Sequence, residues 1–411
     1  MAGTARNSPP KYLAEPVGIS SGFAGAAPEV TAERWAEESR HRLTGPGAYE
    51  WWYFHAMSPS GDGVLITLFE GLPFHPKYLT QINRYAERLG GNVLQKKPWP
   101  SLDPTRYPAA YAAVYQNGKR VCQFLNLYPP RSSAGEGGNV QIGPNRITLR
   151  QDGSIGIAVK GYPFENVRGR PKKRVDRILN MNLSLTPSFP GVQHSSLFRA
   201  PDRTGATHHW ILAAPHGRMS GEIQLVPTAD VSEPLLEMDL NALAYHDHVY
   251  GQGGLSTGVS TLLWGFIQGE DWTAAWHHSL ESAPGDHADG LFFFQKNHPP
   301  LIINAPESRL SRHNFSNWLL KHPGEVAMHG SDARGHPVEL ILSHPAILET
   351  APFHTRLAAK GTLSLPGRGT GFTGSGATHV LKLRRLRWPV LSDLTLLAIT
   401  SVSRDDPIWS E

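Results

Sequence analysis

The hydrophobic residues of this chain occur in short clusters separated by Gly, Pro, Asn and Asp, a pattern typical of β-strands joined by turns. The first strong strand signal is the aromatic segment 49–56, which is followed by a Gly- and Ser-rich turn and an apolar partner segment at 64–69. Residues 145–150 and 155–160 flank an Asp-Gly pair, a strong hairpin signal. We therefore expect a series of antiparallel hairpins.

Helical periodicity is scarce along the chain. It occurs at Lys77–Leu89, more weakly near Pro234–Leu243, and in a short stretch at Thr31–His41 that begins with an N-cap threonine. The high content of Gly (41) and Pro (34) favours short strands and turns over long helices. The predicted fold class is all-β, a sandwich or barrel with few short helices.

Two distant segments of the chain resemble each other and predict two β units. Residues 51–53 lead through a turn into an apolar strand, and Leu263–Gln268 lead through a Gly-Glu-Asp turn into another. Their separation of about 210 residues fits two tandem domains, with a boundary in the Gly-rich stretch 251–258. The expected organisation is a lead-in at 1–44, a first domain at 45–250 and a second domain at 251–411.

The C-terminal segment Lys382–Leu396 mixes arginines with leucines and Trp388. We expect a final strand there, and the alternative is a contact with a membrane surface, since basic and aromatic residues suit that interface. The chain shows no charged start followed by an apolar run, and no stretch of about 18 uninterrupted apolar residues. The expected location is therefore the cytoplasm, with peripheral membrane contact as the alternative.

Composition and motifs argue against several function classes. The 39 Lys and Arg exceed the 35 Asp and Glu by too little, over 411 residues, to indicate nucleic-acid binding. The single cysteine, Cys122, rules out an internal disulfide and a Cys-based metal cluster. No Gly-x-Gly-x-x-Gly motif stands between a strand and a helix, and there is no P-loop, so we expect no nucleotide cofactor.

The 20 histidines and 11 tryptophans include four clusters that hold most of the candidate chemistry. These clusters are Glu50–Tyr53, Thr207–Trp210, Tyr245–Gly251 and Trp276–His278. His246 and His248 have the His-x-His spacing that places two imidazoles on one strand face. We expect no bound metal, because the next residues offer no third ligand within reach by spacing. The alternative, a zinc site, would take a third ligand from His208, His209, His277 or His278.

Asp247 is the leading candidate for acid–base chemistry. On a strand it shares one face with Tyr245, and burial against aromatic side chains disfavours the charged form of a carboxyl group and raises its pKa. A neutral carboxylic acid can protonate an alkene, and aromatic faces can stabilise the resulting cation. The alternative is a structural aspartate that caps a turn or pairs with His246 or His248.

Four motifs together give the chain a family resemblance. They are residues 50–56 (Glu-Trp-Trp-Tyr-Phe-His-Ala), 208–210 with 214–217, 245–248 (Tyr-His-Asp-His), and 263–265 with 269–271. In order and spacing, the chain resembles the carotenoid 1,2-hydratase (hydroxyneurosporene synthase) family and its AttH-like relatives. The resemblance implies a double lipocalin-like (calycin) fold and cofactor-free chemistry on polyenes or prenyl chains. Similar folds serve tocopherol cyclases and Diels–Alderases of polyketide pathways.

The resemblance also implies roles for residues. The working residues of the hydratases are a His-x-Trp pair and a Tyr-x-Asp pair. These pairs fall on His208 with Trp210 and on Tyr245 with Asp247 in this sequence. We expect Asp247 to donate a proton and Tyr245 to orient it. Trp210 and Trp52 would face the cation, and His208 would position water. The expected substrate-binding residues are Glu50, Trp52, His209, His246, His248 and Trp264.

The predicted function is a cofactor-independent enzyme that hydrates a double bond of a long apolar polyene or isoprenoid. The alternatives are a cyclase or Diels–Alderase of the same fold, and a lipocalin-like carrier that binds an apolar ligand without converting it. All of these need the same apolar cavity, so the sequence does not separate them. It also leaves the substrate and the oligomeric state open.

Overall fold

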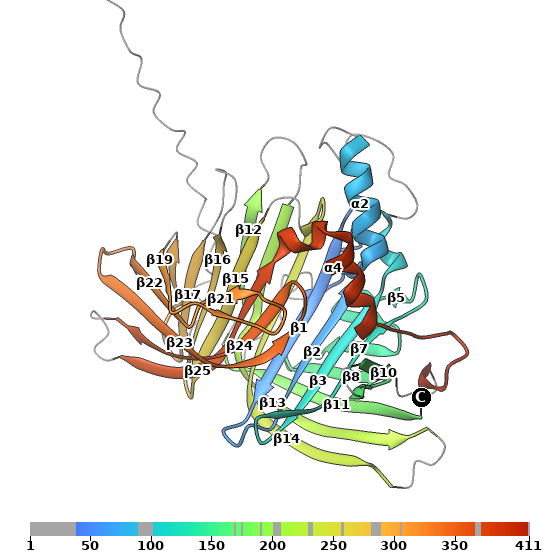
Figure 1. The fold of residues 1–411 in the computed structure, drawn as a ribbon. Coiled ribbons are helices and arrows are strands. Elements are labelled where there is room, and N and C mark those ends of the chain that lie inside the picture. Colours follow the sequence, from blue (N-terminus) through green and yellow to red (C-terminus); the bar gives the residue numbers. More distant parts are fainter. Residues whose placement is uncertain are drawn as a thin grey trace, which may run out of the picture.

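The computed structural model places most of the chain in two large β-sheets, each strongly curved, that lie side by side (Figure 1). The structure describes residues 38–88, 102–167, 170–173, 176–189, 191–199, 207–228, 233–255, 259–280, 289–304, 306–365 and 371–409. The predicted all-β, double lipocalin-like fold with few short helices is confirmed. Most of the helix expected at Thr31–His41 lies outside the described residues.

The first sheet comes mainly from the N-terminal half of the chain. Its strands are β1 (Tyr49–Met57), β2 (Gly63–Glu70), β3 (Ala109–Gln116), β4 (Lys119–Leu127), β5 (Ser133–Ala134), β6 (Asn139–Ile142), β7 (Asn145–Leu149), β8 (Ile155–Gly161), β11 (Arg177–Pro187), β12 (Val192–Arg199), β13 (Thr207–Pro227), β14 (Leu236–Gln252) and β26 (Thr400–Ser401). They follow the order β26-β4-β3-β2-β1-β14-β13-β11-β8-β7-β6-β5, and β12 pairs with β13. A separate ribbon joins β9 (Phe164–Val167) to β10 (Arg170–Lys173).

The second sheet follows in the order β18-β17-β16-β15-β25-β24-β23-β22-β19. Its strands are β15 (Thr261–Gly269), β16 (Trp272–Leu280), β17 (Gly290–Gln295), β18 (Leu301–Asn304), β19 (Glu307–Ser311), β22 (Glu325–Ser331), β23 (Pro337–Thr350), β24 (His354–Ser364) and β25 (Phe372–Lys382). A small hairpin joins β20 (Asn314–Phe315) to β21 (Lys321–His322). The strand segments predicted at 49–56 and at Leu263–Gln268 lie within β1 and β15.

In the described part of the chain the helices are few. Those whose bounds are described are α2 (Pro76–Arg88), α4 (Pro389–Asp393) and the 3-10 turns η2 (Pro104–Arg106), η4 (Leu383–Arg387), η5 (Leu394–Ala398) and η6 (Pro407–Trp409). The helix predicted at Lys77–Leu89 is confirmed through Arg88 by α2. Within the described part of the chain, no helix is long and apolar enough to cross a membrane.

Two predictions of local structure are wrong. The weak helix expected near Pro234–Leu243 is the start of strand β14, in which Met238, Leu240 and Ala242 are buried at every second position. The strand expected at Lys382–Leu396 is instead the short helices η4, α4 and η5. Proline cannot donate a ladder hydrogen bond, and Pro389 begins α4 at its favoured first position.

Three apolar clusters hold the molecule together. The first core lies in the hollow of the first sheet and includes Trp52, Phe54 and Ala56. The second core lies in the hollow of the second sheet. A third group, the middle cluster, joins the sheets and includes Trp51 and Tyr53, the β1 residues that alternate with those of the first core. Strand β1 is therefore buried on both faces, and its two faces belong to different clusters.

Within the described residues, the segment that follows the second sheet returns to the first sheet. The strands of the first sheet end with β14 at Gln252, and those of the second begin with β15 at Thr261. After the second sheet, residues 383–399 return to the first sheet, where β26 pairs in parallel with β4. The domain boundary expected at residue 250 stays a prediction.

Candidate functional site

The candidate site lies in the middle cluster, where β1, β13 and β14 of the first sheet face β15 and β16 of the second. In the pairing of β1 with β14, Trp51 is opposite Val249 and Tyr53 is opposite Asp247. Because alternate strand residues point to opposite faces, Asp247 shares the face of Tyr53 and belongs to the side that meets the second sheet.

Asp247 is completely buried, and its side chain interacts with Trp210 and Tyr245. The Tyr245 hydroxyl donates to Oδ2 at 2.9 Å, whereas Oδ1 has no hydrogen-bond partner among the described residues. Burial raises the pKa of Asp247 to about 7, although interactions with Trp210 and Tyr245 act to lower it. A substantial fraction of this carboxyl group is therefore protonated at neutral pH.

Aromatic rings from both sheets surround the carboxyl group. Tyr245 stacks on Phe266 with 4.0 Å between the ring centroids, and Tyr53 meets Trp264 edge to face at 5.1 Å. Such rings are apolar but present negative faces, so they exclude water and still stabilise a positive charge. The setting suits a reaction that creates a cation away from bulk solvent.

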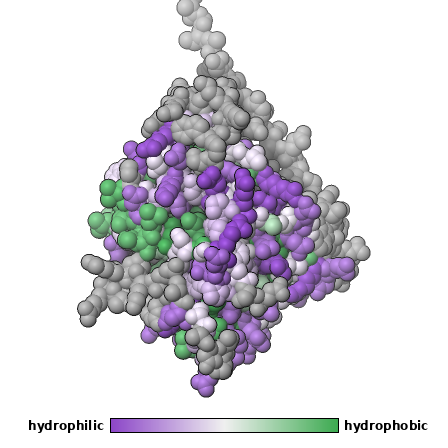
Figure 2. Space-filling view, turned by 90° about the vertical axis from the view of Figure 1, so that its right-hand side faces the viewer, coloured by the Kyte–Doolittle hydropathy of each residue, from purple (hydrophilic) through white to green (hydrophobic). Residues whose placement is uncertain are grey.

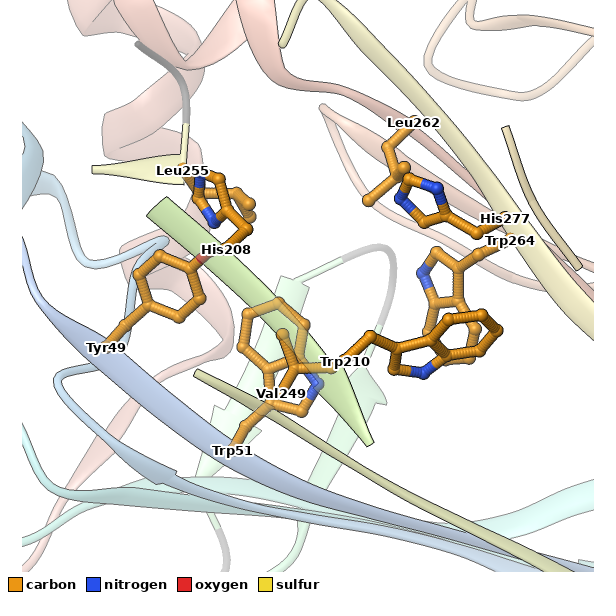
Figure 3. A pocket seen from close by; sticks show the side chains of 9 residues that line it. All are labelled: Tyr49, Trp51, His208, Trp210, Val249, Leu255, Leu262, Trp264 and His277. Atoms are coloured by element: carbon orange, nitrogen blue, oxygen red, sulfur yellow. The ribbon is translucent and has the colours of Figure 1, made fainter. Parts of the chain in front are cut away.

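A small cavity opens next to these residues (Figure 3). It is lined by Tyr49, Trp51, His208, Trp210, Val249, Leu255, Leu262, Trp264 and His277. In Figure 3, Trp210 lies between the side chains from β1 and those from β15 and β16. The cavity volume of about 20 Å³ is room for about one water molecule. Asp247 is not part of the lining, but Val249, on the same face of β14, is.

His208 is the titratable residue of the cavity that the sequence singled out. It is buried, and its ring lies 5.3 Å from that of Tyr49. Burial lowers the pKa of His208 well below its usual value, and the nearby His209 and His277 lower it further. His208 is therefore a neutral imidazole, which can both accept and donate a hydrogen bond.

Four of the predicted substrate-binding residues face away from the cavity. Glu50, Trp52, His246 and His248 lie on the opposite faces of β1 and β14. The prediction that Trp52 lines the same space as Asp247 is wrong, because the alternation of β1 turns Trp52 into the first core, where it stacks on His248 at 4.7 Å. His209 also points away and stacks on Tyr250 at 4.5 Å. Trp264 does line the cavity.

The residues on this opposite face form their own hydrogen-bonded network. Glu50 Oε1 lies 2.8 Å from His248 Nε2 and 2.7 Å from His41 Nδ1, while His246 Nε2 lies 3.0 Å from Glu38 Oε2. Burial alone would raise the pKa of Glu50, but the hydrogen bonds to His248 and His41 outweigh burial and lower it. The network therefore stabilises a buried carboxylate.

The same network contains a group of metal-type ligands that the sequence did not indicate. Ligand atoms of His41, Glu50 and His248 lie within 4.8 Å of one another. His246, the other half of the His-x-His motif, instead bonds to Glu38. His41 comes from the lead-in, so no local spacing could have placed it beside Glu50. The expected absence of a metal stays a prediction.

The sequence missed several residues that line the cavity. Tyr49 and Trp51 line the cavity and lie on the face of β1 opposite to Glu50 and Trp52. The strand pattern therefore indicates both pairs, one for each face. The sequence indicates His277 only as an alternative zinc ligand. In the structure it lines the cavity, with 5.9 Å between the centroids of its ring and the Trp210 ring. Leu255 and Leu262, which flank the connection between the sheets, carry no chemical signal in the sequence.

Comparison with known proteins agrees with this picture. No family model matches the chain. A hydroxyneurosporene dehydrogenase of Chlorobaculum tepidum is 27% identical to this chain over 339 residues. The match covers 78% of this chain and 79% of the relative. A solved structure assigned to AttH from Nitrosomonas europaea superposes with a TM-score of 0.54 at 12% identity, covering 90% of this chain and 99% of that one. Kievitone hydratase from Nectria haematococca gives a TM-score of 0.50 at 11% identity, with 87% and 94% coverage.

These similarities confirm the resemblance to the carotenoid-related, AttH-like family that the motifs indicated. The structural similarities establish the shared fold. The assignment of residues to catalytic and binding roles rests on the geometry described above.

Proposed function

We propose that this chain, which is similar to a carotenoid-related protein and to an AttH structure, is a cofactor-independent hydratase, which adds water to a double bond of a long apolar polyene or isoprenoid. The observation that carries the proposal is the buried carboxyl group of Asp247, with a pKa of about 7 and one oxygen that has no hydrogen-bond partner among the described residues. The C. tepidum relative is named a hydroxyneurosporene dehydrogenase, which supports a compound of that class as the ligand, although the name gives a dehydrogenation and not a hydration.

The first step is a proton transfer from Asp247 to one alkene carbon of the substrate. A C–H bond forms, the carboxyl O–H bond breaks, and the electrons of the double bond leave a tertiary carbocation on the neighbouring carbon. The Tyr245 hydroxyl, 2.9 Å from Oδ2, stabilises the carboxylate that remains. An acid with a pKa near the working pH is suited to this role, since it is both present and able to give up its proton.

Aromatic faces stabilise the carbocation until water arrives. Trp51, Trp210 and Trp264 line the cavity from three different strands. A desolvated cation over a Trp ring gains roughly 2 kcal/mol or more, and the largely buried, apolar lining of the cavity limits competition from bulk water. Trp51 takes the place that the sequence had given to Trp52.

The second step is the addition of water. His208, a neutral imidazole at the cavity wall, accepts a hydrogen bond from the water and directs its oxygen toward the cation. A C–O bond forms, and the proton released from the oxonium returns to the Asp247 carboxylate. The acid is thereby restored, and no cofactor is consumed.

A long substrate needs more room than the cavity has. At about 20 Å³ the cavity holds about one water, so binding requires the side chains of the middle cluster to move apart. Leu255 and Leu262 form the part of the lining next to the connection between β14 and β15. We propose that the polyene enters between the two sheets along this side.

The reaction product separates the candidate functions. Purified protein would be incubated with an acyclic carotenoid in D₂O, and the product analysed by mass spectrometry. A hydratase yields a product heavier by one water, with one deuterium bound to carbon. A cyclase yields an isomer of the substrate without an added water, and a carrier returns the substrate unchanged. Either of the last two results would contradict the proposal.

The Asp247→Asn variant tests the assigned acid. Asparagine keeps the shape of the side chain but has no acidic proton, so we expect the hydration rate to fall by at least ~10²-fold. Asp239→Asn is the matched control, because Asp239 lies exposed on the same strand β14. If Asp247→Asn bound the polyene and hydrated it as fast as the control did, the mechanism would be wrong.

A further inference from the structure

On the face of the molecule shown in Figure 2, hydrophobic residues gather mainly in one patch on the left, with a smaller group near the lower end. Among the described residues, seven of the eleven large apolar side chains that are exposed come from only two segments, 315–319 and 388–397. We call five of them the apolar rim: Phe315, Trp318, Leu319, Trp388 and Val390. Leu319 and Val390 are 73% and 75% exposed, which is costly in water and unusual for a monomer.

The two halves of the apolar rim are held together by one arginine. Arg385 of η4 donates from Nη1 to the carbonyl oxygen of Trp318 and from Nη2 to that of Leu319, both at 2.8 Å. Leu319 has a φ of +54°, in the left-handed region that non-glycine residues seldom adopt. The hairpin between β20 and β21 is thus fixed beside η4 with its apolar side chains outward.

The surroundings of the apolar rim are basic. Segments 312–321 and 382–397 together contain six lysines and arginines but a single acidic residue, Asp393. Arg384, Arg387 and Lys321 are exposed beside the rim. Exposed aromatic residues surrounded by cations are the features that bind the interface of an anionic lipid bilayer. An anionic bilayer always carries the negative charge that this basic surface complements, whereas a protein partner need not be acidic.

The other side of η4 faces the candidate site. Leu383 and Leu386 are buried in the middle cluster together with the cavity residues Leu255 and Leu262. The backbone N–H of Arg384 donates to the carbonyl oxygen of Ser260 at 3.3 Å, next to the start of β15. One short helix therefore separates the apolar rim from the side of the cavity where Leu255 and Leu262 lie.

We propose that the apolar rim docks on an anionic lipid membrane, with Trp318 and Trp388 inserted at the interface and Arg384, Arg387 and Lys321 contacting lipid headgroups. Docking would bring the Leu255 and Leu262 side of the cavity to the bilayer, where long apolar molecules dissolve. The docking surface itself does not depend on the reaction proposed for Asp247.

The test is co-sedimentation of the full chain with vesicles, without any substrate. The vesicles contain phosphatidylcholine alone or with about a third phosphatidylglycerol, an anionic lipid. We expect binding to the anionic vesicles, weaker binding at high salt because exposed charges are screened, and little binding to phosphatidylcholine alone. Wild-type protein that stays in the supernatant with anionic vesicles at low salt would overturn the proposal.

Paired variants locate the docking surface. Trp318→Ser combined with Trp388→Ser should weaken vesicle binding about 10-fold or more, as should Arg384→Glu combined with Lys321→Glu. The matched controls are Val121→Ser with Ile341→Ser, which are also exposed and apolar, and Arg334→Glu. Controls that lose binding as much as the rim variants would contradict the assignment, provided that circular dichroism shows all variants folded.

A second copy of the chain is the competing occupant of the apolar rim. Size-exclusion chromatography with light scattering, over a range of concentrations, tests it. A dimer that dissociates in the Trp318→Ser, Trp388→Ser variant would show that the rim is a protein interface and would overturn the membrane proposal. Loss of vesicle binding in variants that still hydrate a detergent-dispersed polyene would separate docking from catalysis.

Discussion

At the scale of single residues, Asp247 shows how burial sets chemistry. An exposed aspartate has a pKa near 4 and is ionised at neutral pH, so it cannot protonate an alkene. Among the aromatic rings of the middle cluster, burial raises the pKa of Asp247 to about 7, even though Tyr245 donates a hydrogen bond to it. The residue that gives the site its acid must therefore also affect the stability of the fold.

The pH dependence of stability measures this effect. Because the pKa of Asp247 is higher in the folded state than in the unfolded state, its contribution to the free energy of unfolding is fully present below pH 3.8. This contribution is lost as the pH rises through 7. The Asp247→Asn variant has no carboxyl group to ionise and should not show this loss. The free energy of unfolding of the variant, relative to wild type, should therefore increase between pH 4 and pH 8. The shift corresponds to at most about 4 kcal/mol.

Urea denaturation of both proteins at the two pH values checks the expectation, with Asp239→Asn as the control. Comparing differences between pH values cancels any effect of asparagine that does not depend on pH. A stability difference that stays constant between pH 4 and pH 8 would show that Asp247 has an ordinary pKa in the folded protein.

At the scale of elements, the strands of the site were predictable but their orientation was not. The aromatic alternation of β1 predicted a strand, and the Tyr-x-Asp spacing placed Tyr245 and Asp247 on one face, as the structure shows. Both faces of β1 are apolar, because each packs into a different cluster. The pattern therefore gave no sign of which face meets the second sheet, and Trp52 was assigned in place of Trp51.

Other features were unpredictable because they depend on distant segments. Glu38 bonds to His246 and Glu50 bonds to His248, 208 and 198 residues apart along the chain, and no spacing in the sequence indicates such pairs. The mixture of Leu and Arg residues in the C-terminal segment predicts a strand, but Leu383 and Leu386 are buried three positions apart, which is helical spacing.

The strands β3, β23 and β24 meet at a buried ion pair that joins the two sheets. Tyr111 and Tyr115 each donate to Glu349 Oε1 at 2.5 Å, and the fully buried Arg356 lies 3.5 Å from the same oxygen. Burial alone would raise the pKa of Glu349, but Arg356 and Arg120 outweigh it and lower the pKa to about 2. This pair stabilises the fold above pH 4.5, and its contribution is lost as the pH falls from 4.5 toward 2.

Glu349→Gln should destabilise the protein by about 3 kcal/mol at neutral pH, because it leaves Arg356 buried without a counter-charge. Thermal unfolding at pH 7 and in acid measures the loss, which should shrink as the pH falls below 4.5. The double variant Glu349→Gln, Arg356→Met should recover part of the stability. If the double variant were less stable than Glu349→Gln alone, the buried charge would not be the cause.

At the scale of the whole molecule, the site exists only where two sheets meet. Asp247, Trp210 and Trp51 come from the first sheet, whereas Trp264 and His277 come from the second. Ligand sites commonly form where structural units meet, because each unit can supply part of the lining. The C-terminal segment adds a further connection, since Val402 and Ile408 are buried in the first core.

Ile408→Ala tests how much this last connection contributes. Ile408 is 1% exposed, so its truncation should create a cavity in the first core and cost about 2–4 kcal/mol. Val121→Ala, at a side chain 47% exposed, is the control and should change little. Differential scanning calorimetry measures both. Equal melting temperatures for Ile408→Ala and wild type would mean that residues 400–409 only lie against the first sheet.

The return of the chain end to β4 also governs the order in which this protein can be made. Thr400 pairs with Asn126 and Ser401 with Leu127, so the end of β4 gains this partner only when a segment 274 positions later (400 minus 126) has been synthesised. At ~5–20 residues per second, that edge waits roughly 15–55 s after its own synthesis. An open strand edge is a site for wrong pairing between nascent chains. Expression yield should therefore depend on chaperones that act during translation.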